Sequence, residues 1–156
     1  MKPKKKRVLA PKAIARRWFD QLWNRKNPAV IAELMSPSAA GRTEGGEIRG
    51  PAEFRSKVFE PLTRAFPAFR MKLDGLFAEG ENVAIRWTFI ATHDGPFGDL
   101  AATGRTAICS GMTWLKCRNG KIVGGSDHYN LHGLVGYLSG GPASATVRAA
   151  KRGARL

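Results

Sequence analysis

The stretch Trp114-Leu-Lys-Cys-Arg-Asn-Gly-Lys-Ile-Val-Gly-Gly-Ser-Asp127 decides the fold, because it joins a strong turn signal to a lone carboxylate. Asn119-Gly120 favours a tight reverse turn, since glycine tolerates positive φ. Residues 106–117 and 121–129 are therefore expected to form the two arms of an antiparallel hairpin. If the Asp127 side chain faces the interior, desolvation raises its pKa and makes it a candidate general acid or base.

The length of this turn leaves two strand registers open. A three-residue turn with Gly120 in the left-handed region places Asp127 opposite Gly111, with Thr113 diagonal on the same face. A glycine opposite the acid would leave room for a ligand. A two-residue turn instead pairs Asp127 with Met112, an apolar neighbour that would raise the pKa of the acid. Both registers are compatible with a base.

The first part of the chain shows helical spacing. Residues 12–35 carry apolar side chains every three to four positions and predict two helices, separated at Asn27-Pro28. Asn27 is expected to cap the second helix and Pro28 to lie in its first turn. Residues 36–50 are rich in Ser, Gly and charge and are expected to be a loop. A third helix is expected over residues 51–66.

The second part of the chain changes to a period of two. Alternation over residues 69–73 and 83–92 predicts two strands before the hairpin. An apolar segment, Leu131–Leu138, closes the pattern. Helices followed by antiparallel strands indicate an α+β domain, with the N-terminal helices packed on a curved antiparallel sheet. Such a cone-shaped α+β barrel has one open mouth and therefore a pocket.

The formal net charge of +14 is concentrated at the two ends of the chain. Of the 26 Lys and Arg residues, eight lie in residues 1–17 and four in residues 148–156, and neither stretch contains an acid. The remaining 14 basic residues face all 12 acids, so the body is nearly neutral, which disfavours nucleic-acid binding by the folded part. Polyanion binding by the N-terminal tail stays open, through Lys4, Lys5, Lys6 and Arg7.

We predict a basic disordered arm over residues 1–12, one domain over residues 13–138 and a basic disordered tail over residues 139–156. No apolar run approaches the ~20 residues of a membrane-spanning helix. Cys109 and Cys117 fall on one predicted strand roughly 26 Å apart, too far for a disulfide, which fits a reducing compartment. A cytoplasmic protein is expected, with nuclear or organelle targeting by the basic N-terminus as the alternative.

Several stretches, taken in order, resemble the SnoaL-like polyketide cyclase or ester cyclase family, which has a nuclear transport factor 2-like fold. The matching stretches are Trp18-Phe-Asp-Gln-Leu-Trp-Asn24, Ala65-Phe-Pro67, Ala78-Glu-Gly-Glu-Asn-Val-Ala-Ile-Arg-Trp87, Thr92-His-Asp-Gly-Pro-Phe97, Thr103-Gly-Arg105 and Gly120-Lys-Ile-Val123. The resemblance implies ring closure of a small molecule by aldol chemistry without a metal or cofactor. It also implies Asp127 as the catalytic acid.

The chain departs from the family pattern around this acid. A histidine of the preceding strand falls at Thr113, a glutamate and a tryptophan fall at Gly124 and Ser126, and a second acid falls at Asn130. The acid is kept without its usual companions. The resemblance therefore implies a cofactor-independent cyclase or isomerase acting on an apolar, oxygenated substrate, with a non-catalytic ligand-binding or assembly scaffold as the alternative.

Carbanion chemistry beside a ketone needs a base and a donor that stabilises the enolate oxygen. Alternation places Tyr129 on the face of Asp127 and His128 on the opposite face, so Tyr129 is the better partner. The predicted catalytic residues are Asp127, Tyr129 and Asn130. The predicted substrate-binding residues are Trp18, Arg86, His93, Met112, Thr113 and Trp114.

Two of these predictions carry their own alternatives. Arg86 would lower the pKa of Asp127 and anchor a polar ligand if both side chains faced inward, and otherwise lies at the surface. His93 follows a strand and precedes Asp94-Gly95-Pro96, where a surface histidine is the default.

We expect no metal site, because His128 and His132 straddle a strand end. The edge of the curved sheet is expected to favour a homodimer.

Overall fold

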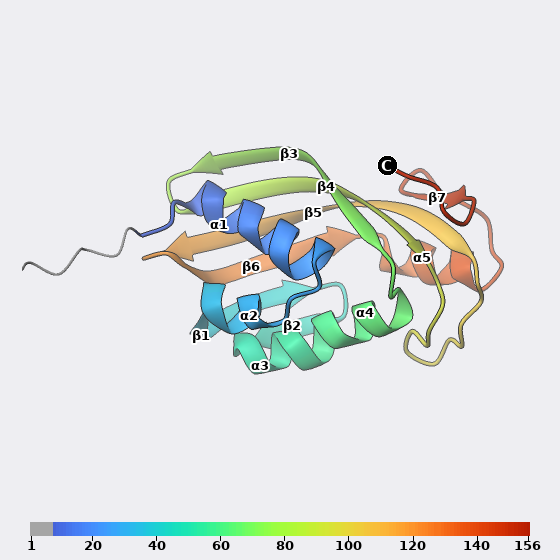
Figure 1. The fold of residues 1–156 in the computed structure, drawn as a ribbon, viewed down its shortest axis with the longest axis horizontal. Coiled ribbons are helices and arrows are strands. Elements are labelled where there is room, and N and C mark those ends of the chain that lie inside the picture. The colour runs from blue at the N-terminus through green and yellow to red at the C-terminus, as the bar shows by residue number, and fades with distance from the viewer. Residues whose placement is uncertain (1–7) are drawn as a thin grey trace, which may run out of the picture.

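The computed structural model describes residues 8–156 (Figure 1). The helical segments are α1 (Pro11–Arg17), η1 (Trp18–Asn24), α2 (Ala29–Leu34), α3 (Gly50–Phe54), η2 (Arg55–Phe59), α4 (Glu60–Ala65) and α5 (Leu131–Leu138). The strands are β1 (Met35–Thr43), β2 (Gly46–Arg49), β3 (Arg70–Glu79), β4 (Asn82–Thr92), β5 (Thr106–Arg118), β6 (Lys121–Tyr129) and β7 (Val147–Ala150). Within residues 8–156, no helix has both the length and the apolar character needed to cross a membrane.

The strands form one sheet in the order β2-β1-β6-β5-β4-β3, with β7 added to β5. The helices α1 and η1 run across one face of this sheet (Figure 1). The path of paired strands begins at β2 and ends at β3. These two end strands are not neighbours in the sheet, so it is curved but not closed. The α+β class and the packing of N-terminal helices on a curved sheet are confirmed.

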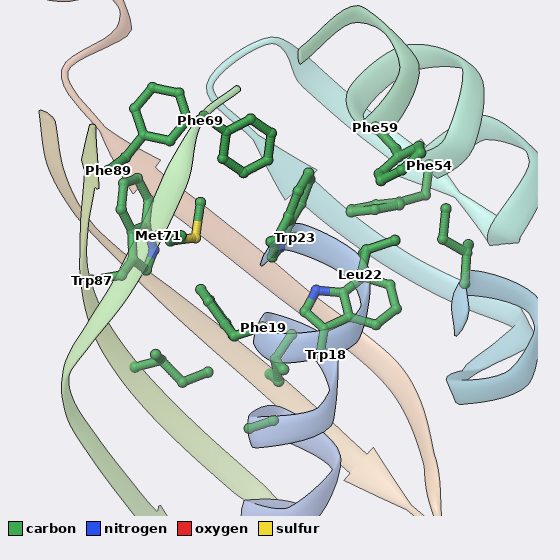
Figure 2. Close-up of a cluster of buried hydrophobic side chains, with 14 of the residues drawn as sticks. Trp18, Phe19, Leu22, Trp23, Phe54, Phe59, Phe69, Met71, Trp87 and Phe89 are labelled. Carbon is green, nitrogen blue, oxygen red and sulfur yellow. The ribbon is translucent and has the colours of Figure 1, made fainter. Parts of the chain in front are cut away.

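The predicted helix periodicity explains how the core fills. Ile14, Trp18 and Leu22 are all buried, as their spacing predicts. In η1 the hydrogen bonds lengthen to five residues, as from the Arg25 amide to the Asp20 carbonyl. This wider turn also brings Phe19 and Trp23 inward. Figure 2 shows the result, a cluster in which aromatic side chains from the helices meet Phe69, Met71 of β3, and Trp87 and Phe89 of β4.

Residues 36–50 form strands, so the loop predicted there is wrong. β1 pairs antiparallel with β2 and parallel with β6, which makes the sheet mixed rather than wholly antiparallel. The apolar signal of these two strands is sparse, because Ala39 in β1 and Ile48 in β2 are buried residues that stand between polar neighbours in the sequence. Gly41 allows the close pairing, because a Cβ there would lie 2.8 Å from the Gly125 carbonyl oxygen.

The hairpin β5–β6 forms as predicted, but in neither predicted register. Asn119 and Gly120 both have positive φ and make a two-residue turn that pairs Arg118 with Lys121. Ile122 pairs with Cys117 and Gly124 with Lys116, which leaves Val123 as the extra residue of a β-bulge. The bulge shifts the later pairs by one residue, so Asp127 lies opposite Thr113.

The last 18 residues differ from the disordered tail that the sequence predicts. β7 pairs antiparallel with the first part of β5, and Val147 is fully buried. Beyond it, both guanidinium nitrogens of Arg152 donate to the Asp94 carboxylate, at 3.1 and 2.7 Å. The strand pairing, one fully buried apolar residue and one ion pair thus attach this segment to the domain. They are too few to be recognised in a Gly- and Ala-rich sequence.

Candidate functional site

Two cavities on the inner face of the sheet meet at Asp127. The larger has a volume of about 180 Å³ and lies between the sheet and the segments η2, α4 and α5. The smaller, about 50 Å³, lies between Trp18, Phe54 and the β1–β6 pair. Thr43, Thr113 and Asp127 line both cavities. A ligand in either cavity would therefore contact the carboxylate.

The larger cavity is mainly apolar. Its lining comprises Phe19, Trp23, Thr43, Gly45, Lys57, Val58, Pro61, Leu62, Met71, Trp87, Phe89, Phe97, Cys109, Thr113, Asp127, Tyr129, Leu131 and Leu134. The polar groups among these are few and Asp127 is the acid. Burial raises the pKa of the Cys109 thiol to about 11, so this cysteine stays a neutral wall residue. Such a lining suits an apolar molecule with a small number of oxygen atoms.

Asp127 is held by a neighbouring side chain on β5. The Thr113 hydroxyl donates to Asp127 Oδ1 at 2.6 Å, and Trp87 Nε1 donates to the Thr113 hydroxyl at 3.0 Å. Burial raises the pKa of Asp127 above its usual value. The bond from Thr113 and the nearby His128 lower the pKa, and Glu44 raises it. Desolvation is the largest of these effects, as expected for an acid inside an apolar pocket.

Tyr129 lies on the same face as Asp127, as alternation predicts. Its ring packs against Trp87 with centroids 6.0 Å apart, and the residue lines the larger cavity. Burial, followed by the adjacent Asp127, raises the pKa of Tyr129 to about 12. The phenol is therefore neutral at physiological pH and able to donate a hydrogen bond.

The structure brings together Asp127, Tyr129, Thr113 and Trp18, and separates them from three other predicted residues. Arg86, Met112 and Trp114 lie on the outer face of the sheet and line neither cavity of Asp127. The placement of Met112 and Trp114 in that pocket is therefore wrong, and Arg86 takes the surface position that was left as its alternative. All three line an open groove of about 610 Å³, whose lining also includes Thr113 and Tyr129. Met112 and Trp114 flank Thr113 in sequence, and side chains of consecutive strand residues point to opposite faces.

His93 and Asn130 make structural contacts outside the two cavities. His93 is fully buried rather than at the surface, and its Nδ1 accepts the backbone N–H of Thr103 at 3.3 Å. Its ring packs on Phe66, and burial lowers its pKa. Asn130 caps α5, since its Oδ1 accepts the Gly133 N–H at 2.7 Å. Neither residue lines a cavity with Asp127.

Glu44 is a neighbour of the site that the sequence analysis missed. It lies in the turn between β1 and β2, and its Oε1 accepts the Tyr129 N–H at 3.4 Å. The same oxygen lies 3.6 Å from His128 Nδ1. Residues 36–50 were expected to be a loop, so no pattern placed this acid beside β6. Only the parallel pairing of β1 with β6 brings it there.

Within residues 8–156, His, Cys, Asp and Glu side chains do not gather in groups of three or more suited to a metal ion. Cys109 and Cys117 are both free and buried. The groups that face the larger cavity are the Asp127 carboxylate, which can transfer a proton, and the Tyr129 phenol, which can donate a hydrogen bond.

The sequence of residues 13–136 matches the family model described as SnoaL-like polyketide cyclase, and the chain belongs to this family. The resemblance stated from the sequence is thus confirmed. A comparison with functionally curated proteins finds no match.

Solved structures with the same fold cover nearly the whole domain. The "Putative SnoaL-like polyketide cyclase from Jannaschia Sp. CCS1" superposes with a TM-score of 0.78 at 18% identity, over 89% of this chain and 99% of its own. IdmH, "a putative polyketide cyclase from Streptomyces antibioticus", gives 0.73 at 19% identity, over 84% and 99%. AclR, "a putative hydroxylase from Streptomyces galilaeus", gives 0.74 at 28% identity, over 86% and 83%.

Proposed function

We propose that this chain binds an apolar, oxygenated small molecule of the polyketide or ester type and catalyses its cyclisation or isomerisation, with Asp127 as the acid and base. One observation carries the proposal. A carboxylate whose pKa is raised by burial lies where two apolar cavities meet, with one oxygen held by Thr113. A carboxylate base whose pKa is raised by burial in an apolar cavity suits the removal of a proton beside a carbonyl group.

The steps follow from the positions of the two groups. Asp127 takes the α-proton of a bound ketone, and the Tyr129 phenol donates a hydrogen bond to the enolate oxygen. The enolate carbon then attacks a second carbonyl carbon of the same molecule, forming the ring bond. The proton on Asp127 returns to the new alkoxide, so that no oxidant or reductant is used. In an isomerisation the proton returns to another carbon instead.

The replacement Asp127→Asn tests the base role. We expect α-proton exchange into a panel of β-keto esters in D₂O, followed by NMR, to fall by about 10²–10⁴-fold. Affinity for the same ketones should stay largely intact, because the amide has nearly the same shape. Met112→Leu is the matched control on the outer face of the neighbouring strand and should exchange at the wild-type rate. Unchanged exchange in Asp127→Asn would rule out the base role.

A non-catalytic scaffold of the same fold is the first alternative. The absence of the family companions at Thr113, Gly124 and Ser126 favours it. It predicts that ketones bind to wild type and to Asp127→Asn with equal affinity and that neither protein exchanges their α-protons.

Hydroxylation is a second alternative, because AclR is described as a hydroxylase and shares 28% identity with this chain. Cyclisation and isomerisation are redox-neutral, whereas insertion of oxygen consumes O₂ and two electrons. Turnover under strictly anaerobic conditions would support the proton-transfer chemistry. Turnover that needs O₂ and a reductant would replace it.

The expected homodimer is better supported by the outer face of the sheet than by its edge. The edge strand β3 carries alternating charges, such as Lys72 and Asp74, which disfavour edge pairing. The outer face instead exposes Phe77, Met112 and Trp114, at 72%, 51% and 41%. We therefore propose a two-fold contact of a second copy over these residues. Sedimentation of Trp114→Ser/Phe77→Ser should then show a monomer.

Binding of a polyanion by Lys4, Lys5, Lys6 and Arg7 remains a prediction, and these residues lie outside the described ones. Deleting residues 1–12 tests it. Steeply salt-dependent binding of a single-stranded DNA oligonucleotide should disappear with the arm. Binding that persists would place the polyanion on the folded body.

A further inference from the structure

We propose that Trp87 and Thr113 form a one-way hydrogen-bond relay that positions Asp127, leaving its second oxygen, Oδ2, as the atom that exchanges protons with a ligand. Thr113 and Trp87 are thus positioning residues that act through Asp127. The inference rests on the proposed acid and base role of Asp127. A test of the relay nevertheless needs no substrate.

The direction of the relay follows from the donors available. The indole Nε1 of Trp87 can only donate, and it points at the Thr113 hydroxyl at 3.0 Å. The hydroxyl has a single proton, and its 2.6 Å contact with Oδ1 of the ionised Asp127, which can only accept, uses that proton. The Thr113 hydroxyl therefore accepts a hydrogen bond from Trp87 and donates one to Asp127. Oδ1 accepts the hydrogen bond from Thr113, and proton uptake is directed to Oδ2.

Strand register explains why an indole can reach this position. Trp87 lies opposite Gly111, and Thr113 lies one inward-facing position further along β5, diagonal to the indole. A Cβ at residue 111 would lie 2.4 Å from the Trp87 ring. Glycine thus lets the indole lie flat across β5, where its N–H meets Thr113. The room that the sequence analysis assigned to a ligand at Gly111 is filled by this ring.

The relay takes the place of the histidine that the family pattern often has at residue 113. A threonine hydroxyl does not take up a proton near neutral pH, so it can hold the carboxylate without competing for the proton. Its donated bond favours the ionised acid and opposes the effect of burial. The relay thereby keeps Asp127 usable as a base inside an apolar cavity.

The charged and titratable groups around Asp127 define the controls. Glu44 comes from the β1–β2 turn, and His128 and Tyr129 come from β6 itself. Arg42 of β1 lines the smaller cavity and Lys57 of η2 the larger. Because the charges of Glu44 and His128 act on Asp127, the experiment is repeated in the Glu44→Gln/His128→Asn background.

The experiment follows the indole N–H resonances of the protein and the carboxyl carbon of Asp127 by NMR across a pH titration. We expect the Trp87 indole N–H to shift with the same midpoint as the Asp127 carboxyl carbon, since the relay connects them. The Trp114 indole donates to Asn82 on the outer face and should stay constant through this step. In Asp127→Asn, the step should disappear from the Trp87 signal.

Thr113→Val removes the relay hydroxyl at nearly constant volume. We expect it to uncouple the Trp87 signal and to raise the pKa of Asp127 by about one unit, the size expected for losing a hydrogen bond to a charged group. Thr113→Ser should restore both observables. If Thr113→Val does not fold, Trp87→Phe provides the second test, and it should raise the pKa of Asp127 by a smaller amount.

The relay would be overturned by a Trp87 indole signal that ignores the Asp127 titration, or by a folded Thr113→Val protein in which Asp127 titrates as in wild type. These results are distinguishable from failure of the proposed function. A coupled titration without α-proton exchange would keep the relay and remove the catalysis. If α-proton exchange depended on Asp127 but the Trp87 signal did not follow the Asp127 titration, the catalytic role would stand and the relay would be removed.

Discussion

The two faces of the β5–β6 hairpin have different chemistry although their residues alternate in sequence. The inner face holds Thr113 and Asp127 beside two apolar cavities. The outer face holds Met112, Trp114 and His128 around an open groove. Sequence neighbours such as Thr113 and Trp114 therefore belong to different surfaces, and only the facing of each side chain tells which of them can meet a substrate.

The facing of Asp127 depends on one extra residue. Ile122 is buried on the inner face, so a regular strand would turn residues 124, 126 and 128 inward and Asp127 outward. The bulge at Val123 reverses this alternation and places Asp127 inside, opposite Thr113. A β-bulge that redirects one side chain is a common device beside active sites. Here the bulge determines that Asp127 is buried in the pocket rather than exposed on the outer face.

Filling the inner cavity should give the largest effect in a comparison of the two faces. Val58 lines the larger cavity from η2 and is half-buried, so Val58→Trp would occupy the space of a ligand. We expect affinity for the ketone panel to fall roughly 10–200-fold, the range for steric misfit in an apolar pocket. Isothermal titration calorimetry measures this loss directly.

Met112→Trp is the matched variant on the outer face, where the side chain is 51% exposed. It adds comparable bulk to the open groove and should leave ketone affinity within about twofold, as for surface substitutions in general. If Met112→Trp weakened binding as much as Val58→Trp, the ligand site would lie on the outer face instead.

Adding one methyl group to the inner face should give the next largest effect. In Gly111→Ala the new Cβ would lie 2.4 Å from the Trp87 ring and 2.8 Å from the His128 carbonyl oxygen. We expect a loss of about 1–3 kcal/mol in the free energy of unfolding, measured in urea. Gly136→Ala in α5 meets nothing within 4 Å and should stabilise the protein by up to about 1 kcal/mol. Equal effects would show that Trp87 moves freely away from β5.

The fold was largely predictable because its signals are local. Helical spacing around Trp18, alternation along β4 and the Asn119-Gly120 turn each depend on a few neighbouring residues. β1 and β7 were missed for the opposite reason. Their pairing depends on Gly41 fitting against Gly125 and on Val147 filling the end of the core, and both contacts join residues distant in sequence.

The candidate site was predictable only in part. Asp127 and Tyr129 could be placed on one face by alternation, and Thr113 by its position in the family pattern. Met112 and Trp114 were assigned to the same pocket because apolar character suggested burial, although they flank Thr113. Glu44 and the hydrogen bond from Trp87 depend on register across several strands, which a single bulge changes.

Burial of Asp127 also predicts how stability depends on pH. Its folded-state pKa is raised above 3.8, so the native state holds a proton that the unfolded state releases. Stability contributed by this group is therefore present below pH 3.8 and is lost as pH rises through the folded-state pKa. Asp127→Asn should melt higher than wild type at pH 7, by up to about 5 °C. The difference should shrink as the pH is lowered toward 4, and a constant difference would contradict a raised pKa.

We expect the smallest effect from removing one cationic side chain on each face of the sheet, Lys57 on the inner face and Arg86 on the outer face. Lys57 lines the larger cavity but already pairs with Glu53 at 3.1 Å, so Lys57→Ala should raise the KM for an oxygenated ketone only by about two- to fivefold. Arg86 is exposed in the outer groove, and Arg86→Ala should change neither KM nor the pKa of Asp127. An Arg86 variant that shifts the carboxyl-carbon titration of Asp127 would mean that the guanidinium acts on the acid through the sheet. The sheet would then separate the side chains of the two faces without screening Asp127 from the charge of Arg86.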